Sequence, residues 1–321
     1  MGFSFTARRQ VLSTIAGAVL SVTAAGAFAA APIVGTQAPG YYRTMLGDFE
    51  VTVLSDGTVD LPMDKLLQAK PAQLQQAFTK NFVKAPVETS VNTFLINTGS
   101  KLVLVDTGAG GLFGPTLGKL LANLKAAGYQ PEQVDEIYIT HLHPDHIGGL
   151  GAGQSVFPNA VVRADRHDAD YWLSKSQASS APADKQGYFQ GAQNALAPYV
   201  GAKKFVPFDG STELVPGIRA TSSYGHTPGH TSYVVESRGQ KLVLIGDLIH
   251  ANFIQFDDPT VTIAFDSDSK TALAARQAGF AEAARSGYLI GAAHLPFPAL
   301  GHLRSSGKGY QFVPVSYSVP R

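Results

Sequence analysis

The sequence predicts an α/β protein in which two β-sheets pack face to face and helices cover their outer surfaces. Apolar runs typical of strands and apolar repeats typical of helices occur in both halves of the chain, and in each half the predicted strands lead into polar loops. With 45% apolar residues in 321, the chain can bury a substantial core. No linker divides the segment from residue 30 to 321, so we expect it to form a single domain.

The first 29 residues have the composition of a signal peptide. Two arginines, Arg8 and Arg9, precede an apolar run at residues 11–25, and Ala27, Phe28 and Ala29 resemble a cleavage site. A membrane anchor is the alternative, but the run is rich in small residues and no charged stop follows it. We therefore expect a periplasmic or secreted protein with no membrane segment in its mature form.

The segment at residues 6–12 also resembles a twin-arginine signal, although Ala7 and Val11 depart from the usual pattern. A twin-arginine route would export the protein already folded and loaded with metal.

Charge and cysteine content exclude several classes of function. The chain has 25 basic and 24 acidic residues, and removal of Arg8 and Arg9 leaves 23 basic residues, so the mature protein is close to neutral. Nothing in this balance favours nucleic acid or a membrane as partner, and a small-molecule substrate is expected. The chain has no cysteine, which excludes disulfides, thiolate metal sites and a cysteine nucleophile.

Two hairpins are predicted in the first third of the chain. Residues 49–54 alternate between polar and apolar, reach an Asp56-Gly57 turn signal and resume at residues 59–61. A second hairpin is expected from strands at 93–96 and 102–105.

The middle of the chain alternates predicted helices and strands. Apolar residues at helical spacing predict a helix at 115–127, followed by strands at 136–140 and 161–163 and a helix near 165–174. The polar stretch at 177–187 is expected to be a loop and is the best candidate for a mobile lid.

The second half repeats this pattern. Strands are expected at 218–222, 232–235 and 242–245, a helix at 269–284 that Asp268 or Ser269 caps, and a last strand at 288–292.

The most informative motif follows the strand at 136–140. His141, His143, Asp145 and His146 lie within six residues, so two imidazoles of an extended loop can reach one metal ion while Asp145 and His146 turn toward a neighbouring position. A polar surface loop is the alternative, but three of the nine histidines of the chain lie within these six positions. The motif therefore predicts two adjacent metal sites.

Further potential ligands lie at or just beyond the ends of other predicted strands. They are His226 and His230 in the Gly225 to His230 segment, Asp247 after Gly246, and His294 after Ala293.

These ordered motifs resemble those of the metallo-β-lactamase superfamily, and the resemblance spans residues 106–294. It implies an αββα sandwich of two mixed β-sheets flanked by helices. It also implies that one metal is bound by His141, His143 and His226, the other by Asp145, His146 and His294, and that Asp247 bridges both. Asp106, within the motif at 105–108, would then hydrogen-bond a ligand or its loop, and His230 would have a similar supporting role rather than bind metal directly.

The resemblance implies hydrolysis by two divalent metal ions. Zinc is the default, and His and carboxylate ligands also suit Co²⁺, Mn²⁺ or Fe²⁺. Two ions roughly 3.5–4 Å apart hold a shared water and lower its pKa, so that a hydroxide bridging the metals is the nucleophile and Asp247 positions it.

Within the superfamily, nearly the whole mature chain is similar to methyl parathion hydrolase and to related dihydrocoumarin-type lactone and aryl-ester hydrolases. The similarity includes residues 39–43, 119–136 and 307–318. Phosphotriesterases of this group have an arginine near Leu66 and leucines at the positions of His250 and Phe265. These differences favour small neutral lactones or aryl esters as substrates with some organophosphate triester activity, and phosphotriester hydrolysis as the main activity is the alternative.

The same resemblance places a set of side chains around the substrate. Phe113, Trp172 and Tyr188 are expected at the pocket mouth, and Leu66, His250, Ile263 and Phe265 near the metals. Each aromatic residue could equally pack in the core. His250 could donate a hydrogen bond to substrate or only pack beside the metal loop.

Other functions remain as alternatives. An exported metal-binding protein without catalysis would keep the same ligands, and a β-lactamase is not excluded by the absence of cysteine. The apolar segment around Tyr41 and Tyr42 could contribute to a homodimer interface.

Overall fold

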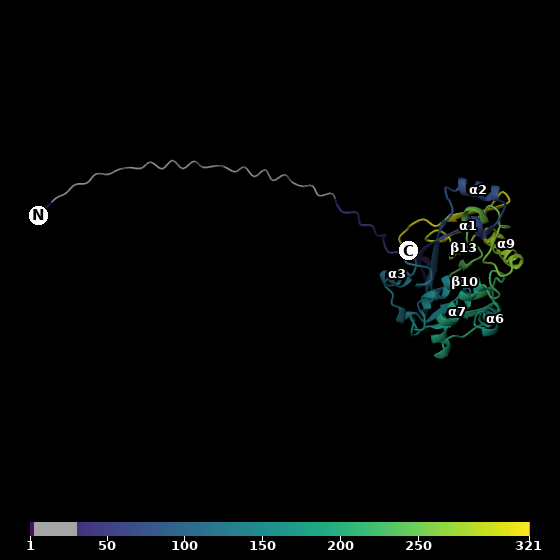
Figure 1. The fold of residues 1–321 in the computed structure, drawn as a ribbon, viewed down its shortest axis with the longest axis horizontal. Coiled ribbons are helices and arrows are strands. Elements are labelled where there is room, and N and C mark those ends of the chain that lie inside the picture. Colours follow the sequence, from purple (N-terminus) through teal and green to yellow (C-terminus); the bar gives the residue numbers. More distant parts are fainter. Residues whose placement is uncertain (3–30, 321) are drawn as a thin grey trace. The chain divides into compact units, whose positions relative to one another are not determined.

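The computed structural model describes residues 1–2 and 31–320 of the chain. Residues Ala38–Arg321 form one compact unit, whose course along the chain is shown in Figure 1. Apart from residues 1 and 2, the predicted signal peptide lies outside the described residues. No helix in the described part of the chain has the length and apolar character needed to cross a membrane.

The first sheet has six strands and is mixed. Its order is β1 (Tyr41–Leu46), β2 (Phe49–Leu61), β4 (Val87–Asn97), β5 (Leu102–Val105), β6 (Glu136–Tyr138) and β7 (Val161–Arg163). The strands from β1 to β5 pair antiparallel, whereas β5, β6 and β7 run parallel.

The second sheet has seven strands and is also mixed. Its order is β15 (Gly309–Pro314), β14 (Leu300–Ser306), β13 (Leu289–Gly291), β11 (Gln240–Leu244), β10 (Thr231–Ser237), β9 (Ile218–Ser222) and β8 (Thr212–Val215). Only β11 and β13 pair in parallel. A separate short ladder joins β3 (Leu67–Gln68) to β12 (Thr262–Ile263).

The core lies between the two sheets. Alternate residues of β4, such as Phe94 and Ile96, point to the same side and pack with Val235 and Leu244 of the second sheet. Tyr138 and Tyr233 stack across this interface with ring centroids 5.5 Å apart. Since burial of a large apolar side chain contributes about 1.5–3 kcal/mol, this layer accounts for much of the free energy of folding.

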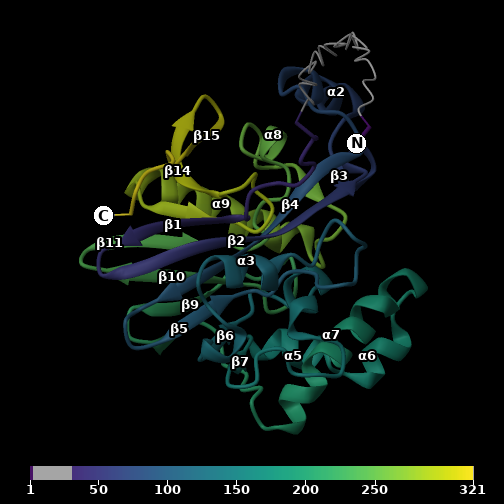
Figure 2. The same ribbon diagram turned by 90° about the vertical axis from the view of Figure 1, so that its left-hand side faces the viewer.

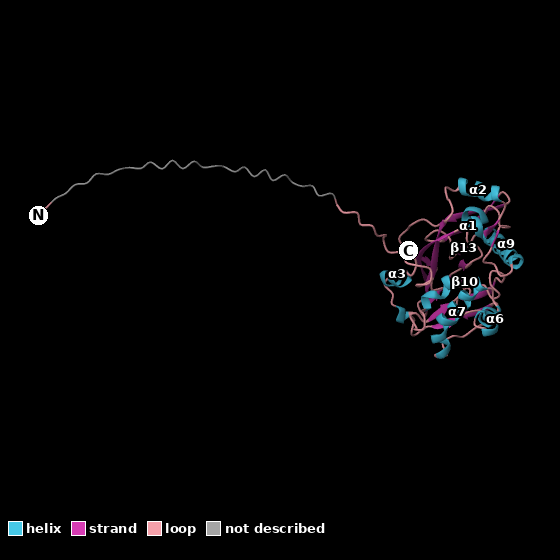
Figure 3. Ribbon diagram, in the orientation of Figure 1, coloured by secondary structure: helices cyan, strands magenta, loops and turns pink. Residues whose placement is uncertain are grey.

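Helices cover both sheets, which completes the predicted αββα sandwich (Figure 3). Four helices lie on the side of the first sheet: α3 (Leu120–Ala126), α5 (Arg166–Trp172), α6 (Lys175–Ser180) and α7 (Ala183–Gly201). Their side chains Leu124, Phe189 and Leu196 pack with Leu104 and Ile137 of that sheet in a second apolar cluster. Helix α9 (Ser269–Ser286) packs against the second sheet.

A third apolar cluster stands apart from these layers. It is formed by α1 (Met63–Leu66), α2 (Pro71–Lys80), α8 (Asn252–Gln255) and the β3–β12 ladder. Figure 2 shows α2 and β3 at one end of the unit and α5, α6 and α7 grouped at the other.

The structure corrects the first predicted hairpin. Residues 49–61 form one continuous strand, β2, with a bulge between Ser55 and Gly57. The Asp56 side chain is fully buried and accepts hydrogen bonds from the backbone N–H groups of Ala109, Gly118 and Leu120 at 2.9, 3.1 and 3.0 Å. Asp56 therefore serves long-range contacts rather than a tight turn.

The prediction of a lid loop at 177–187 is also wrong, because this segment is divided between the helices α6 and α7. Ser174 caps α6 by accepting a hydrogen bond from the Gln177 N–H, and α7 buries Phe189 and Leu196 against the first sheet. The predicted helix at 115–127 begins only at Leu120. The second hairpin, β7, β9 and the Asp268-capped helix α9 agree with the sequence prediction.

Candidate metal centre

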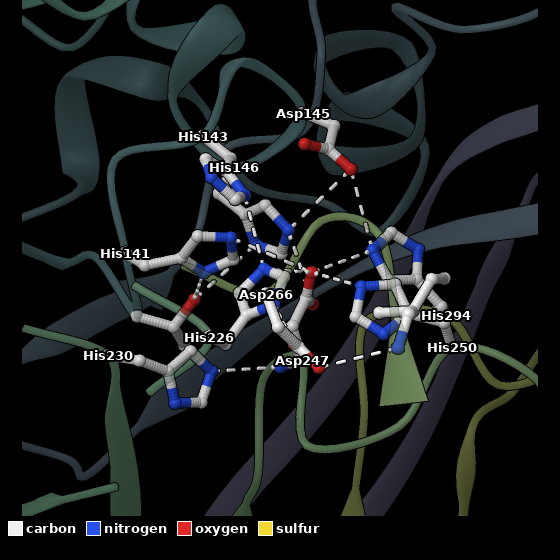
Figure 4. A network of polar contacts seen from close by, with 12 residues as sticks. His141, His143, Asp145, His146, His226, His230, Asp247, His250, Asp266 and His294 are labelled. Carbon is white, nitrogen blue, oxygen red and sulfur yellow. Dashed lines mark hydrogen bonds and ion pairs between the residues drawn. The ribbon is translucent and has the colours of Figure 1, made fainter. Parts of the chain in front are cut away.

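The potential ligands meet at one edge of the two sheets. His141 and His143 follow β6, and the short helix α4 (Pro144–Ile147) begins immediately after them and carries Asp145 and His146. The loop from β9 to β10 supplies His226, the end of β11 leads to Asp247, and the end of β13 leads to His294. Figure 4 shows these side chains converging on Asp247.

One group consists of His141, His143, His226 and Asp247, whose potential ligand atoms all lie within 4.8 Å of one another. Asp247 Oδ2 is 3.3 Å from His226 Nε2 and 3.6 Å from His141 Nε2. His226 Nε2 is 3.1 Å from His143 Nδ1. Ligand atoms of a tetrahedral zinc site, each about 2.0–2.1 Å from the metal, lie at about this spacing from one another.

A second group consists of Asp145, His146 and His294. Asp145 Oδ2 lies 3.7 Å from His146 Nε2 and 3.4 Å from His294 Nε2. Asp247 also contacts this group, with Oδ1 3.3 Å from His146 Nε2 and Oδ2 3.2 Å from His294 Nε2. The carboxylate of Asp247 therefore lies between the two groups.

The cluster contains buried polar atoms that lack a hydrogen-bond partner. Among the described residues, His141 Nε2, His146 Nε2 and Asp247 Oδ1 are buried and accept or donate no hydrogen bond. A buried polar atom without a partner costs about 1–3 kcal/mol, unless a ligand satisfies it. Imidazole nitrogens and carboxylate oxygens are suitable donors for divalent ions, so the residues present fit two such ions.

The charges of the cluster also favour cations. Burial raises the pKa of Asp247, but the surrounding histidines His294, His146 and His250 hold it well below the usual value. Burial lowers the pKa of His141 and His143 well below the usual value, which leaves both as the neutral imidazoles that metal binding requires.

Three histidines of the cluster, His146, His226 and His294, instead bind protons more tightly. Burial lowers the pKa of His146, but Asp247, Asp145 and Asp106 together raise it well above the usual value. Burial likewise lowers the pKa of His226, and hydrogen bonds with Asp247 and Asp266 raise it to about 9. Burial also lowers the pKa of His294, but Asp247 and Asp145 together raise it above the usual value. The carboxylates thus create a negative potential where a metal ion would compete with protons.

Asp106 supports the loop that carries the ligands after β6. Its Oδ1 accepts the Thr140 N–H at 2.7 Å, and its Oδ2 lies 2.8 Å from both Thr140 Oγ1 and His146 Nδ1. This contact directs Nε2 of His146 toward the cluster.

His230 supports Asp247. The backbone N–H of Asp247 donates to His230 Nε2 at 3.0 Å, so the proton of this imidazole lies on Nδ1, which is 3.0 Å from the Ser223 carbonyl oxygen. Within the described part of the chain, His230 belongs to none of the groups that could hold a metal. Gly246 allows this close approach, because a Cβ there would lie 2.7 Å from His230 Nε2.

Three residues that support the ligands were not predicted from the sequence. Asp266 Oδ1 lies 2.9 Å from His226 Nδ1, and its side chain is fully buried. Arg276 of α9 is also fully buried and donates to the carbonyl oxygens of Leu248 and Val261 at 2.6 and 2.8 Å. Its guanidinium lies 3.8 Å from Asp266.

The third missed residue is Asp168 of α5, which links two ligand loops. Its carboxylate accepts the backbone N–H of Leu142, between His141 and His143, at 2.8 Å and that of Gly229 at 2.6 Å. Burial raises the pKa of Asp168 to about 6 despite these hydrogen bonds. No local motif surrounds Asp168, Asp266 or Arg276, so only their long-range contacts identify them.

A cavity of about 280 Å³ opens onto the metal cluster. Of the predicted substrate-contacting residues, Leu66, Phe113, Tyr188, His250 and Phe265 line it, as do the cluster residues His143, Asp145, Asp247 and His294. Val59, Leu61 and Pro62 also line it and were not predicted. They lie here because β2 continues past Asp56 instead of turning back.

Trp172 and Ile263 do not line the cavity, contrary to the prediction. Trp172 is 2% exposed and packs behind His143, with ring centroids 5.2 Å apart, and Ile263 is buried in the third apolar cluster. Both are core residues, the alternative that the sequence left open for Trp172.

His250 lies at the boundary between the cavity and the cluster. Its Nε2 is 3.0 Å from Asp247 Oδ2, and its ring stacks on that of His294 with centroids 5.0 Å apart. Burial lowers the pKa of His250 to about 4 although Asp247 opposes this effect.

Comparison with known proteins extends these observations. The family model of the metallo-β-lactamase superfamily matches residues 86–294. A solved structure described as the hydrolase AbOPH in the β-lactamase superfamily is 40% identical, with a TM-score of 0.84, and the match covers 88% of this chain and 100% of that one. AidC, described as a dizinc quorum-quenching lactonase, is 28% identical with a TM-score of 0.81, and the match covers 87% and 99%.

Curated relatives include N-acyl homoserine lactonases. One from Bacillus cereus is 30% identical over 152 residues, which is 47% of this chain and 52% of that protein, so the chain spans about half the length of this relative. One from a Bacillus species is 30% identical over 196 residues, which is 54% of this chain and 70% of that protein.

Proposed function

The chain belongs to the metallo-β-lactamase superfamily, and from this premise we propose that it is a two-metal hydrolase of small neutral lactones or aryl esters. We assign His141, His143 and His226 to one ion, Asp145, His146 and His294 to the other, and Asp247 to both. Zinc is the proposed metal, in keeping with the description of AidC as a dizinc enzyme.

The observation that carries this proposal is the position of the cluster at an apolar cavity. Outside the cluster, the residues that line the cavity are mainly aliphatic and aromatic, among them Val59, Leu61 and Phe265. None of the lining residues is a lysine or an arginine. A cavity of about 280 Å³ with this lining suits a small uncharged substrate with an apolar or aromatic portion.

The side chains have distinct tasks in the proposed reaction. When bound, two divalent ions supply Lewis-acid polarisation of the substrate carbonyl and an activated water. Asp247, whose depressed pKa keeps it ionised, holds the two halves of the site together. Apolar residues such as Leu66 and Phe265 exclude bulk water and strengthen electrostatic interactions at the reacting carbonyl.

Tyr188 and His250 are the polar groups of the cavity wall outside the seven proposed ligands. Both can orient a substrate by hydrogen bonding, and the ring of Tyr188 can also pack against an aryl group. His250 is held neutral by burial, and its single N–H, on Nε2, faces the Asp247 carboxylate. Its Nδ1, which has no hydrogen-bond partner among the described residues, is therefore left as a hydrogen-bond acceptor without added charge.

A substrate panel on the zinc-loaded protein tests the proposal. The panel contains dihydrocoumarin, phenyl acetate, an N-acyl homoserine lactone and methyl parathion, each assayed with the protein and with its Asp247→Ala variant. Turnover of lactones or aryl esters that is lost on chelation and in the variant is the expected result. Zinc uptake without turnover of any member would instead indicate a metal-binding protein.

The relative kcat/KM values decide between the substrate classes. A preference for dihydrocoumarin or phenyl acetate supports the proposal as stated, and a preference for the N-acyl homoserine lactone narrows it to the activity named for the Bacillus relatives. A higher kcat/KM for methyl parathion would establish phosphotriester hydrolysis as the main activity.

A further inference from the structure

His250 belongs to a third group of potential ligands that overlaps the two groups already assigned. Asp247, His250 and His294 have ligand atoms within 4.8 Å of one another, and all three side chains are buried. Asp247 Oδ2 is 3.0 Å from His250 Nε2 and 3.2 Å from His294 Nε2. These distances match those between ligand atoms that share one metal ion.

The third group shares His294 with the group that contains Asp145 and His146. In Figure 4, contacts lead from His294 Nε2 both to Asp145 and to Asp247. The orientation of His294 is set by its Nδ1, which lies 3.0 Å from the carbonyl oxygen of Ser90. Nε2 of His294 therefore faces two carboxylates. Asp145 also contacts His146, whereas Oδ2 of Asp247 also contacts His250.

His250 is held in place by its backbone. The N–H groups of His250 and Ala251 donate to Gln255 Oε1 at 2.8 and 2.9 Å, and Gln255 Nε2 donates to the carbonyl oxygen of Val261 at 3.0 Å. Gln255 is fully buried. The His250 imidazole has no hydrogen-bond or ion-pair partner among the described residues other than Asp247.

Asp145 is the least constrained of the donors to the second ion. Its side chain is 25% exposed, whereas those of Asp247 and His250 are 3% and 2% exposed. An exchange of donors at this position would therefore replace a partly solvated carboxylate by a buried, preorganised imidazole.

We propose that His250 is a metal ligand, and that with Asp247 and His294 it forms an alternative position for the ion that Asp145, His146 and His294 also hold. This inference rests on the proposed two-metal function. It differs from a role of His250 toward substrate, because it makes metal binding itself depend on the imidazole.

The test is a titration of the metal-free protein with Co²⁺ alone, in which binding is measured by the d–d absorption of Co²⁺ and by calorimetry. The wild type should bind two equivalents. Asp145→Asn should still bind two, with the second dissociation constant raised at least about tenfold. The double variant Asp145→Asn/His250→Phe should bind one equivalent, because both alternative positions have lost a donor.

Two further variants in the Asp145→Asn background separate metal binding from other roles of His250. Glutamine at position 250 can donate an N–H to Asp247 but is a poor metal ligand, so Asp145→Asn/His250→Gln should also bind one equivalent. Phe265 packs beside His250 with ring centroids 5.8 Å apart. Asp145→Asn/Phe265→Leu should therefore keep the second equivalent and serves as the control for altered packing.

The possible outcomes are distinguishable. Fewer than two equivalents in the wild type would overturn the proposed function as well. With two in the wild type, loss of the second ion in Asp145→Asn alone, or its retention in the His250→Phe or His250→Gln double variant, would overturn only the role of His250. Should a double variant fail to fold, the His250→Phe single variant decides, since an unchanged Co²⁺ spectrum would contradict direct ligation.

Discussion

The carboxylate of Asp266 lies 2.9 Å from Nδ1 of His226, on the side of the imidazole opposite to the metal cluster. His226 Nε2 contacts Asp247 and His143, so the contact with Asp266 directs this nitrogen into the site. The two residues are 40 positions apart and belong to different loops.

We predict that Asp266→Ala lowers metal affinity about 10- to 100-fold, because His226 loses the acceptor that sets its orientation. Asp266→Asn should lose less, since an amide oxygen can still accept from Nδ1–H. Competition with a chromophoric chelator measures both affinities. Wild-type affinity in the alanine variant, with an unchanged thermal unfolding curve, would show that the contact does not position His226.

Arg276 should be essential for stability. Arg276→Lys is expected to lower the free energy of unfolding by about 2–4 kcal/mol, because a single ammonium group cannot reach the carbonyl oxygens of Leu248, Pro259 and Val261 together. Arg285→Lys on the same helix is the matched control, since its side chain is 73% exposed, and should change stability by less than about 0.5 kcal/mol. Urea unfolding compares the two, and equal effects would contradict the proposed role of Arg276.

Asp56 should determine the position of the loop that carries Phe113. Asp56→Ala removes the acceptor of three backbone N–H groups, and we expect the free energy of unfolding to fall by about 3 kcal/mol or more. Asp60→Ala, at an exposed position of the same strand, should have little effect. Because Phe113 lines the cavity, the Asp56 variant should also raise KM for the best substrate. An unchanged unfolding midpoint would refute the structural role.

Asp168 predicts a specific pH dependence of stability. Its pKa is about 6 in the folded protein and 3.8 in a model peptide, so between these values the folded protein binds more protons than the unfolded chain. The contribution of this group to the free energy of unfolding therefore falls as pH rises from about 4 to 6, by up to about 1.4 kcal/mol per pH unit.

The comparison of wild type with Asp168→Asn isolates this contribution, because the ligand histidines titrate in both proteins. Unfolding by urea is measured on metal-free protein at several pH values. The stability difference between wild type and variant should decrease as pH rises through this window, and a constant difference would show that Asp168 does not titrate there.

The extent to which sequence predicts the site differs from residue to residue. His141, His143, Asp145 and His146 share one turn, so their proximity follows from the chain itself. His226, Asp247 and His294 were identifiable because each lies at a strand end in a motif typical of the superfamily. Asp266 and Asp168 have no such signal, since their partners lie 26–61 positions away.

The errors in the fold have physical causes as well. An Asp-Gly pair is a strong turn signal, but at Asp56 the carboxylate is satisfied by a loop more than 50 residues away and the strand continues. The polar stretch at 177–187 contains little apolar pattern, yet α7, which begins within it, is stabilised by the buried side chains of Phe189 and Leu196, which lie beyond it. In both cases tertiary contacts override local propensity.

The sequence by itself determined the fold class and the identity of the side chains able to bind metal, because strand periodicity and ligand spacing are local properties. Only the tertiary structure decided which of the expected residues line the cavity, that Asp266 and Asp168 join Asp106 in supporting the ligands, and that His250 stacks on His294 beside Asp247. These relationships depend on the packing of segments distant in the chain, and local pattern carries no information about that packing.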